Sequence, residues 1–185
     1  MDVGKDYCVR AVAAVDDALC AELTVLENAS FPHCERLGGP GLKAFVLKRT
    51  NGLLVAEARA RQLGYCLYTR SASSALITKV AVGAAFARRG VGSALVARAL
   101  HELVTTARLP PEEVLLHVDP ERTEARRLYE KFGFREQARL TGYYPDPGSP
   151  FGGRDALLMR LIPEARSGGP PPHPFLDLPP CITEP

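Results

Sequence analysis

The sequence predicts one α/β domain built on a mixed, mostly antiparallel sheet of six to seven strands with about four helices around it. Three observations lead to this fold class. The chain has 185 residues, of which 46% are hydrophobic, and this is the size of one domain with a sizeable core. In its first half, three strand-like runs follow one another closely, as in an antiparallel meander. In its second half, strands alternate with helices, and this order favours a mixed sheet covered by helices.

The first expected elements are a strand and a capped helix. The strand covers residues 7–13. Leucines recur at helical spacing from there towards Asn28, which predicts a helix. Asp16 or Asp17 is expected to cap the start of this helix. Glycines within residues 38–41 are expected to interrupt the chain after this helix.

The meander follows these elements. Residues 42–49 fit either a short helix or a strand, and the pattern does not decide between them. Asn51 and Gly52 together indicate a turn. The three strands expected after this turn cover residues 53–58, 63–70 and 75–82.

The clearest helix of the chain begins at Gly92. Small and apolar residues recur from there to Ala107 at alternating spacings of one and three, which makes a continuous apolar stripe opposite a polar face. Pro110 and Pro111 end this helix. The elements expected beyond it are a strand over residues 114–118, a helix over 121–131 closed by Gly133, and strands over 134–140 and 156–162.

The composition changes sharply near the end of the chain. Eight of the 16 prolines lie between Pro163 and Pro185, and such a segment favours polyproline II or disorder over helices and ladders. We therefore expect one domain over residues 1–163 and a proline-rich, disordered tail over residues 164–185.

Charge and cysteine content argue against several classes of protein. The 23 Lys and Arg against 21 Asp and Glu leave a net charge of +2, whereas nucleic-acid binders concentrate positive charge on one face. Five scattered cysteines without a Cys-x-x-Cys pair favour a reducing compartment over a disulfide framework or structural zinc. The first ten residues lack the apolar core of a secretory signal, and the longest near-apolar run, residues 80–87, is too short to span a bilayer. We expect a monomeric protein of the cytoplasm, or alternatively of the nucleus, with no nucleic-acid, membrane or metal partner.

The segment RRGVGSA, residues 88–94, leads into the long helix. Gly90 and Gly92 let the backbone turn tightly, so that the amides of the first helical turn face outward at the positive end of the helix dipole. Such a site suits a pyrophosphate, and Arg88 and Arg89 add positive charge beside it. The segment is neither a P-loop nor a dinucleotide fingerprint, because no Gly-Lys-Ser/Thr follows and Leu95 occupies the third glycine position. A glycine turn that only starts a helix would give the same pattern.

Together with LHVDPERTEARRLYEKFGF at residues 116–134, this loop resembles the GCN5-related N-acetyltransferase (GNAT) superfamily, whose members move an acetyl group from acetyl-CoA to an amine. The resemblance covers residues 7 to about 163 and implies the GNAT-like acyl-CoA acyltransferase fold, with acetyl-CoA as co-substrate and no metal. The family's Gln/Arg-x-x-Gly-x-Gly pattern begins at Ala87 here, so one pyrophosphate contact is absent there unless Arg88 supplies it. The implied contacts with acetyl-CoA are Val80, Ala81, Val82, Arg88, Arg89, Gly90, Val91, Gly92, Ser93, Ala94, Arg122 and Tyr129.

Two further segments narrow the resemblance. Phe31-Pro32 and Tyr143-Tyr144-Pro145 are similar to the acceptor loops of protein N-terminal α-amine acetyltransferases, including the ribosomal-protein alanine type. The resemblance implies that Phe31, Pro32, Tyr143 and Tyr144 bind the N-terminus of a protein or peptide, with an auxiliary subunit as a further possible partner. A lysine or small-amine acetyltransferase and a catalytically inactive CoA-binding module remain the alternatives.

His117 and Tyr129 are the candidate catalytic residues. Alternation in the strand over residues 114–118 sends His117 to the face opposite its valine and leucine neighbours, and its usual pKa of about 6.5 suits a base. Tyr129 lies at the edge of an apolar helix stripe and keeps its proton at neutral pH, because the pKa of a phenol is about 10. A strand histidine and a packed tyrosine are equally compatible with structural roles. The resemblance implies that His117 is the base and Tyr129 the acid.

The remaining candidate site residues are not assigned to the reaction. Lys79 fits a substrate-site residue or a solvated strand charge, and we favour the solvated charge. His33 has no partner at zinc spacing. His101 and His173 are interpreted as bystanders.

Overall fold

The computed structural model describes residues 7–105, 109–145 and 153–163, and the predicted tail over residues 164–185 lies outside them. One sheet contains seven strands in the order β1-β2-β3-β4-β5-β7-β6. The strands are β1 (Cys8–Val12), β2 (Asn51–Ala58), β3 (Arg61–Arg70), β4 (Ser74–Val82), β5 (Glu113–Val118), β6 (Arg135–Tyr144) and β7 (Arg154–Leu161). Neighbouring strands are antiparallel except for β4 and β5. The predicted fold class is therefore confirmed.

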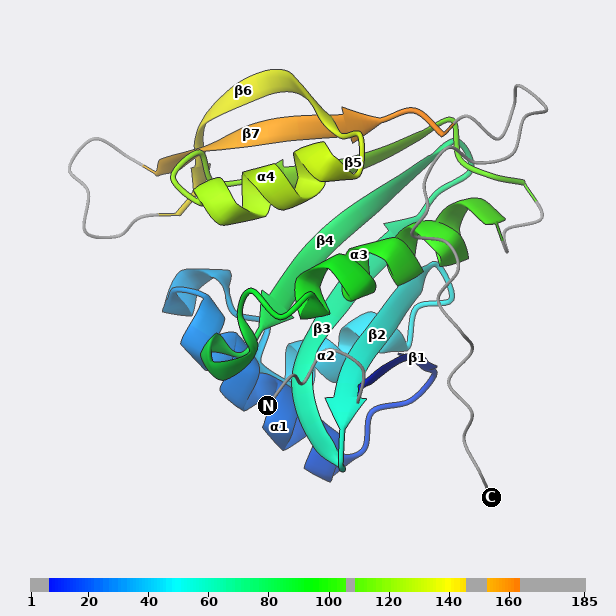
Figure 1. The fold of residues 1–185 in the computed structure, drawn as a ribbon, viewed down its shortest axis with the longest axis vertical. Coiled ribbons are helices and arrows are strands. Elements are labelled where there is room, and N and C mark those ends of the chain that lie inside the picture. Colours follow the sequence, from blue (N-terminus) through cyan, green and yellow to red (C-terminus); the bar gives the residue numbers. More distant parts are fainter. Residues whose placement is uncertain (1–6, 106–108, 146–152, 164–185) are drawn as a thin grey trace.

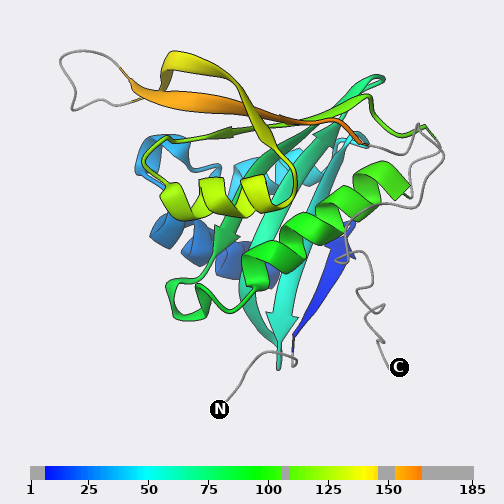
Figure 2. The ribbon, with the colours of Figure 1, turned by 45° about the horizontal axis from the view of Figure 1, so that its top comes forward.

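Helices cover both faces of this sheet (Figures 1 and 2). The helices are α1 (Asp17–Ser30), α2 (Gly38–Val46), α3 (Val91–Leu100) and α4 (Thr123–Lys131), with 3-10 turns at His33–Glu35 and Ala84–Phe86 and a π-helical turn at His101–Thr105. Helices α1 and α2 pack on one face, and α3 and α4 on the other, so a core lies on each side of the sheet. None of the helices in the described ranges is long and apolar enough to cross a membrane.

The capping residue of α1 is Asp16, one of the two predicted candidates. Its carboxylate accepts a hydrogen bond of 2.8 Å from the amide of Leu19, which satisfies one of the amides that have no partner within the helix. The next helix, α2, begins at Gly38, which has φ of +63°.

The predicted break at residues 38–41 is therefore wrong, because these glycines form the first turn of α2. A Cβ at Gly39 would lie 3.0 Å from Sγ of Cys20 on α1, so the glycine lets two helices approach closely. The undecided segment 42–49 continues this helix to Val46.

The predicted turn at Asn51–Gly52 is also misplaced. The chain turns over residues 47–50, and Asn51 and Gly52 already belong to β2. A Cβ at Gly52 would lie 2.1 Å from Cζ of Tyr68 on the neighbouring strand. Gly52 is needed because the Tyr68 ring fills the space of its side chain.

The long apolar stripe forms α3 and the π-helical turn after it. Its residues are buried against the sheet, as predicted: Leu95, Val96, Ala99, Leu100 and Leu103 are all under 10% exposed. The helix begins at Val91, and residues 106–108, at its expected end, lie outside the described ranges.

Candidate active site

A gap opens in the sheet between β4 and β5. The ladder between these two parallel strands ends at the pair of Ile77 and Leu116. Both strands continue past this pair, β4 as far as Val82 and β5 as far as Val118. In this stretch β4 still pairs with β3 on its other side, so the edge that faces β5 is available to a ligand.

A bulge in β4 lies at the point where the strands separate. Tyr68 on β3 pairs with Ile77, and Leu67 pairs with Lys79, which leaves Thr78 as an extra residue in β4. A bulge bends its strand and re-aims the side chains beyond it. The bulge therefore accounts for the separation of β4 from β5 and for the direction of Lys79.

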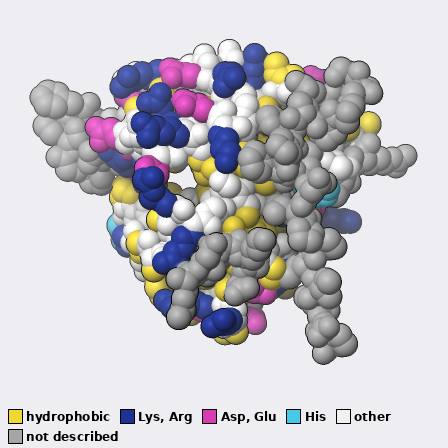
Figure 3. Space-filling model, viewed as in Figure 1, with side chains coloured by type: hydrophobic (Ala, Val, Ile, Leu, Met, Phe, Trp, Pro, Cys, Tyr) yellow, Lys and Arg dark blue, Asp and Glu magenta, His cyan; other side chains and the backbone are white. Residues whose placement is uncertain are grey.

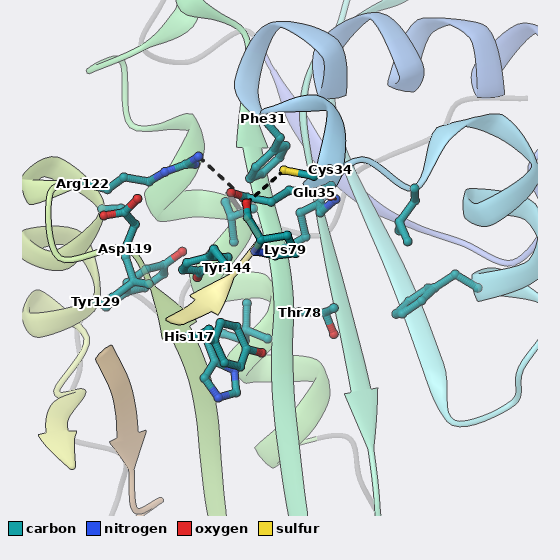
Figure 4. Close-up of a pocket in the computed structure, with 18 residues that line it drawn as sticks. Phe31, Cys34, Glu35, Thr78, Lys79, His117, Asp119, Arg122, Tyr129 and Tyr144 are labelled. Atoms are coloured by element: carbon teal, nitrogen blue, oxygen red, sulfur yellow. Dashed lines mark hydrogen bonds and ion pairs between the residues drawn. The ribbon is translucent and has the colours of Figure 1, made fainter. Parts of the chain in front are cut away.

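The gap is part of a pocket of about 400 Å³ (Figure 4). Its walls come from β4 and β5, from the start of α4, from the segment between α1 and α2, and from the end of β6. Segments that are far apart in the sequence therefore meet around one cavity.

His117 lines this pocket from β5. Its neighbours Val114, Leu116 and Val118 are buried, whereas His117 is half-buried, which is the alternation predicted for this strand. Its imidazole stacks on the ring of Tyr143 with 4.4 Å between the centroids and 17° between the planes. Burial lowers the pKa of His117 below its usual value, so the imidazole is neutral at pH 7 and able to accept a proton.

Tyr129 lines the same pocket from α4 and is 8% exposed. Its ring meets Phe134 edge to face with 6.0 Å between the centroids. Burial raises the pKa of Tyr129 well above its usual value. The hydroxyl therefore keeps its proton at any physiological pH and can act as a hydrogen-bond donor or acid.

The two predicted acceptor segments meet over the pocket. Phe31, Tyr143 and Tyr144 line it, and Pro32 immediately precedes the 3-10 turn between α1 and α2. The two tyrosine rings meet edge to face at 5.0 Å. Both belong to β6, which extends four residues beyond its predicted end at residue 140, so they stand on a strand rather than on a loop.

A thiol and an ion-pair network join these segments. Sγ of Cys34 lies 3.2 Å from the carbonyl oxygen of Pro145. Glu35, whose side chain is 11% exposed, pairs with Arg154 on β7, and Arg154 also pairs with Asp119 after β5. The carboxylates at this end of the pocket are therefore neutralised by neighbouring guanidinium groups.

Arg122 faces the acceptor segments in this structure. Its guanidinium lies 3.8 Å from Oε2 of Glu35 and 5.1 Å from the centre of the Phe31 ring, and Figure 4 shows the side chain directed towards both. The contact with a CoA phosphate that the resemblance implies for Arg122 stays a prediction.

Lys79 is not the solvated charge that we expected. Its side chain is only 9% exposed, and Nζ lies 2.7 Å from Oε1 of Glu27, whose side chain is fully buried. The interpretation as a solvated residue is wrong because the bulge at Thr78 aims Lys79 towards the segment between α1 and α2.

The predicted phosphate loop precedes α3 in the expected geometry. Gly90 has φ of +83°, in the left-handed region that favours glycine, and no side chain caps the helix. The first helical hydrogen bond runs from the amide of Ala94 to the carbonyl of Gly90. The amides of Val91, Gly92 and Ser93 therefore have no acceptor within the helix and face a potential anion.

Positive charge and close packing accompany this loop. Arg88 is exposed, has φ of +61° and pairs with Glu124 on α4 at 3.0 Å. A Cβ at Gly92 would lie 3.3 Å from Cδ2 of Leu128 and 3.6 Å from Cγ2 of Val82. Figure 3 shows the face of the molecule on which α3 and α4 lie, with Lys and Arg side chains around a hollow between these helices. The loop can therefore hold the phosphates of an anionic ligand.

Three charged residues of this site were not predicted from the sequence. The side chains of Glu27, Asp119 and Arg154 are 0%, 7% and 32% exposed. Asp119 also accepts a hydrogen bond of 2.9 Å from the amide of Glu121. The pattern DPE directly after a strand is a turn signal that would have singled out Asp119, whereas no local signal marks Glu27 or Arg154.

The described residues contain no cluster of His, Cys, Asp and Glu that could hold a metal ion. Nor do the cysteines within these ranges form a disulfide.

The middle of the chain matches a known family of domains. Residues 49–136 match the model of the acetyltransferase (GNAT) domain, a range that contains the gap in the sheet, the glycine loop, His117 and Tyr129. Among curated proteins, none matches the sequence.

Solved structures share the fold over most of the chain. The ribosomal-protein-S18-alanine N-acetyltransferase from Escherichia coli is 19% identical with a TM-score of 0.68, and the match covers 84% of this chain and 94% of that one. NAA60 from Arabidopsis thaliana in complex with a bisubstrate analogue is 19% identical with a TM-score of 0.71, covering 84% and 97%. A single-residue mutant of the spermidine N-acetyltransferase SpeG from Vibrio cholerae is 19% identical with a TM-score of 0.67, covering 85% and 94%. At these identities the likeness shows the fold.

Proposed function

We propose that this chain, whose residues 49–136 match the acetyltransferase (GNAT) domain, transfers the acetyl group of acetyl-CoA to the α-amine at the N-terminus of a protein or peptide. The observation that carries the proposal is the shared pocket. A neutral imidazole and a protonated phenol line it, and the two predicted acceptor segments meet over it. Because the similar folds include both a bacterial ribosomal-protein alanine N-acetyltransferase and a spermidine N-acetyltransferase, the choice of acceptor rests on the pocket.

The glycine loop and the open edge of β4 fit acetyl-CoA. The loop offers three backbone amides without helical acceptors at the positive end of α3, which suits a pyrophosphate. Backbone groups of Val80 to Val82 on the edge of β4 that faces the gap suit the amide groups of an extended pantetheine arm. Acetyl-CoA supplies an acetyl group activated as a thioester.

His117 and Tyr129 supply the proton transfers that acetylation requires. The transfer forms a bond between nitrogen and the acetyl carbon and breaks the bond between that carbon and sulfur. His117 accepts the proton that the amine loses, directly or through a water, and Tyr129 donates a proton to the departing sulfur. An α-amine has a pKa of roughly 7.7–8.0, so a weak base such as a neutral imidazole suffices.

The charges of the pocket disfavour a polyamine acceptor. Its lining contains two carboxylates, on Glu35 and Asp119, and two cations, on Lys79 and Arg122. Arg154 pairs with both carboxylates. A substrate with several ammonium groups needs an excess of negative charge, which these described residues do not offer.

The glycine loop can be tested by substitution at Gly92. A Gly92→Glu change places a carboxylate beside the amides that are proposed to bind phosphate, and we expect it to weaken acetyl-CoA binding at least tenfold, or about 1.4 kcal/mol. Gly92→Ala is the matched control, because it introduces the same Cβ against Leu128 without the charge. Calorimetry of both folded variants measures the effect. Equal affinities for the two variants would contradict the phosphate assignment.

Thiol release tests the proposed reaction. The purified protein is mixed with acetyl-CoA and, in separate reactions, with a library of peptides that have free N-termini, with lysine peptides whose α-amine is blocked, or with spermidine. We expect release of free CoA thiol with the first library. Release with spermidine alone would favour a small-amine acetyltransferase, and no release with any amine would favour a CoA-binding module.

A further inference from the structure

Glu27 is a buried carboxylate that the proposed reaction does not use. It lies in the last turn of α1, and its side chain is fully buried. Its two oxygens accept hydrogen bonds from the amides of Leu37 and Gly38, at 3.0 and 2.9 Å. Burial raises the pKa of Glu27, but these amides and the Lys79 ammonium together hold it below its usual value. The carboxylate is therefore charged and fixes the point where the chain enters α2.

Lys79 holds the other part of the same segment. Its Nζ donates to Oε1 of Glu27 at 2.7 Å and to the carbonyl oxygen of Glu35 at 2.6 Å. It also lies 4.6 Å from the centre of the Phe31 ring, within the range of a cation–π interaction. One ammonium group thus contacts the segment at Phe31 and at Glu35, and reaches Leu37 through Glu27.

Arg36 secures the remaining backbone of this segment. Its Nε donates to the carbonyl oxygen of Phe31 at 2.8 Å, and its second terminal nitrogen donates to that of Asn28 at 3.0 Å. These bonds satisfy carbonyls at the end of α1. They act within the segment, however, and do not attach it to the sheet.

Lys79 attaches the segment to β4. Lys79 follows Thr78, the bulge residue, and precedes Val80, which is among the strand residues proposed to contact the pantetheine arm. Other contacts also hold this region, since Arg154 on β7 pairs with Glu35 and the Tyr65 hydroxyl on β3 donates to Glu27 at 3.3 Å. Lys79 is the contact that comes from the strand proposed to hold the donor.

We propose that Glu27 and Lys79 form a positioning pair that sets the acceptor segment, residues 31–37, at the correct place over the pocket. This inference rests on the proposed function, because it assumes that Phe31 and its neighbours bind the acceptor. The pair touches neither reacting group and acts through the backbone of the segment. Its loss shifts the wall against which the acceptor lies and leaves the phosphate loop on α3 unchanged.

Kinetics of Lys79→Met test this role, because methionine keeps the length of the side chain and removes its donors. We expect the KM for a peptide acceptor to rise about tenfold, since small misplacements of a bound substrate are costly. The affinity for acetyl-CoA should stay within about twofold of wild type, because the contacts proposed for it use other residues. Arg160→Met is the control, since it removes an ion pair with Glu113 at the far end of β5. A rise in KM in the control, or none in Lys79→Met, would overturn the proposal.

A double variant separates positioning from stability. Lys79→Met alone leaves the buried Glu27 carboxylate without its cation, which destabilises the fold. Combining it with Glu27→Gln removes both charges, so the Tm should recover towards the wild-type value. The acceptor KM should stay raised, because the backbone carbonyl of Glu35 still lacks the hydrogen bond that Lys79 donates in wild type. A KM that recovers together with Tm would show that the pair only stabilises the fold, and it would overturn the proposal. If Lys79→Met does not fold, the acceptor KM of the double variant is compared directly with that of wild type.

Hydrogen exchange keeps this test separate from that of the proposed function. A wild-type protein that acetylates no N-terminal amine would refute the proposed function, and kinetics would then say nothing of the pair. The amides of Leu37 and Gly38 report on the anchoring itself. We expect both to exchange faster in the double variant than in wild type, and unchanged exchange would overturn the anchoring.

Discussion

A His117→Ala variant is expected to lose about 10²-fold or more of kcat/KM for the peptide acceptor at pH 7. The imidazole lines the pocket and is neutral there, because burial lowers the pKa of His117 below its usual value. The acceptor amine, with a pKa of roughly 7.7–8.0, is still mostly protonated at this pH. Removing the base therefore removes the group that accepts its proton.

The pH dependence of kcat/KM tests whether this loss of activity comes from the His117 imidazole. In wild type, kcat/KM should rise with pH in two limbs, one below about pH 6.5 as His117 loses its proton and one near pH 8 as the amine does. The variant should lack the lower limb. Its deficit should shrink at high pH, where the amine is already neutral.

A matched variant controls for the loss of a histidine. His101 lies at the start of the π-helical turn after α3, and His101→Ala should keep the wild-type profile. A lower limb that persists in folded His117→Ala would assign the titration to another group. His117 would then be a structural strand residue stacked on Tyr143.

Tyr129→Phe is expected to lower kcat about 10²-fold with little change in the affinity for acetyl-CoA. The substitution removes the hydroxyl and keeps the ring, so the edge-to-face contact with Phe134 remains. The hydroxyl is protonated because burial raises the pKa of Tyr129. Without it, the departing sulfur must take its proton from water.

Tyr68→Phe is the control for Tyr129→Phe. Tyr68 is also buried, at 6% exposure, but it lies on β3 and does not line the pocket. Its loss of a hydroxyl should leave kcat unchanged. Full kcat in Tyr129→Phe would move the acid role elsewhere, and Tyr143→Phe would then test the neighbouring phenol.

Local patterns predicted most of the fold. The apolar stripe after Gly92 became the buried face of α3, and alternation placed His117 on the face opposite Val114, Leu116 and Val118. The two halves of the candidate site could be predicted because each is carried by a short segment: the glycine loop by residues 88–94 and the proposed acid by the helix around Tyr129. Such signals depend on neighbours in the sequence.

The remaining features depend on contacts between distant residues. The chain turns between β2 and β3 at Arg59 and Ala60, which both have positive φ although neither is Gly, Asn or Asp. Lys79 looked solvated because its partner, Glu27, lies 52 residues away in the sequence. Glu35 and Arg154 are 119 residues apart. Periodicity cannot reveal such pairs, because they form only when the sheet brings its strands together.

The position of the transferred acetyl group tests the proposed reaction most directly. A peptide with a free α-amine and an internal lysine is incubated with the protein and acetyl-CoA, and tandem mass spectrometry then locates the added group. A second peptide of the same sequence, with its α-amine blocked, serves as the control. We expect acetylation of the α-nitrogen of the first peptide and none of the second. Acetylation of the lysine side chain in both peptides would contradict it.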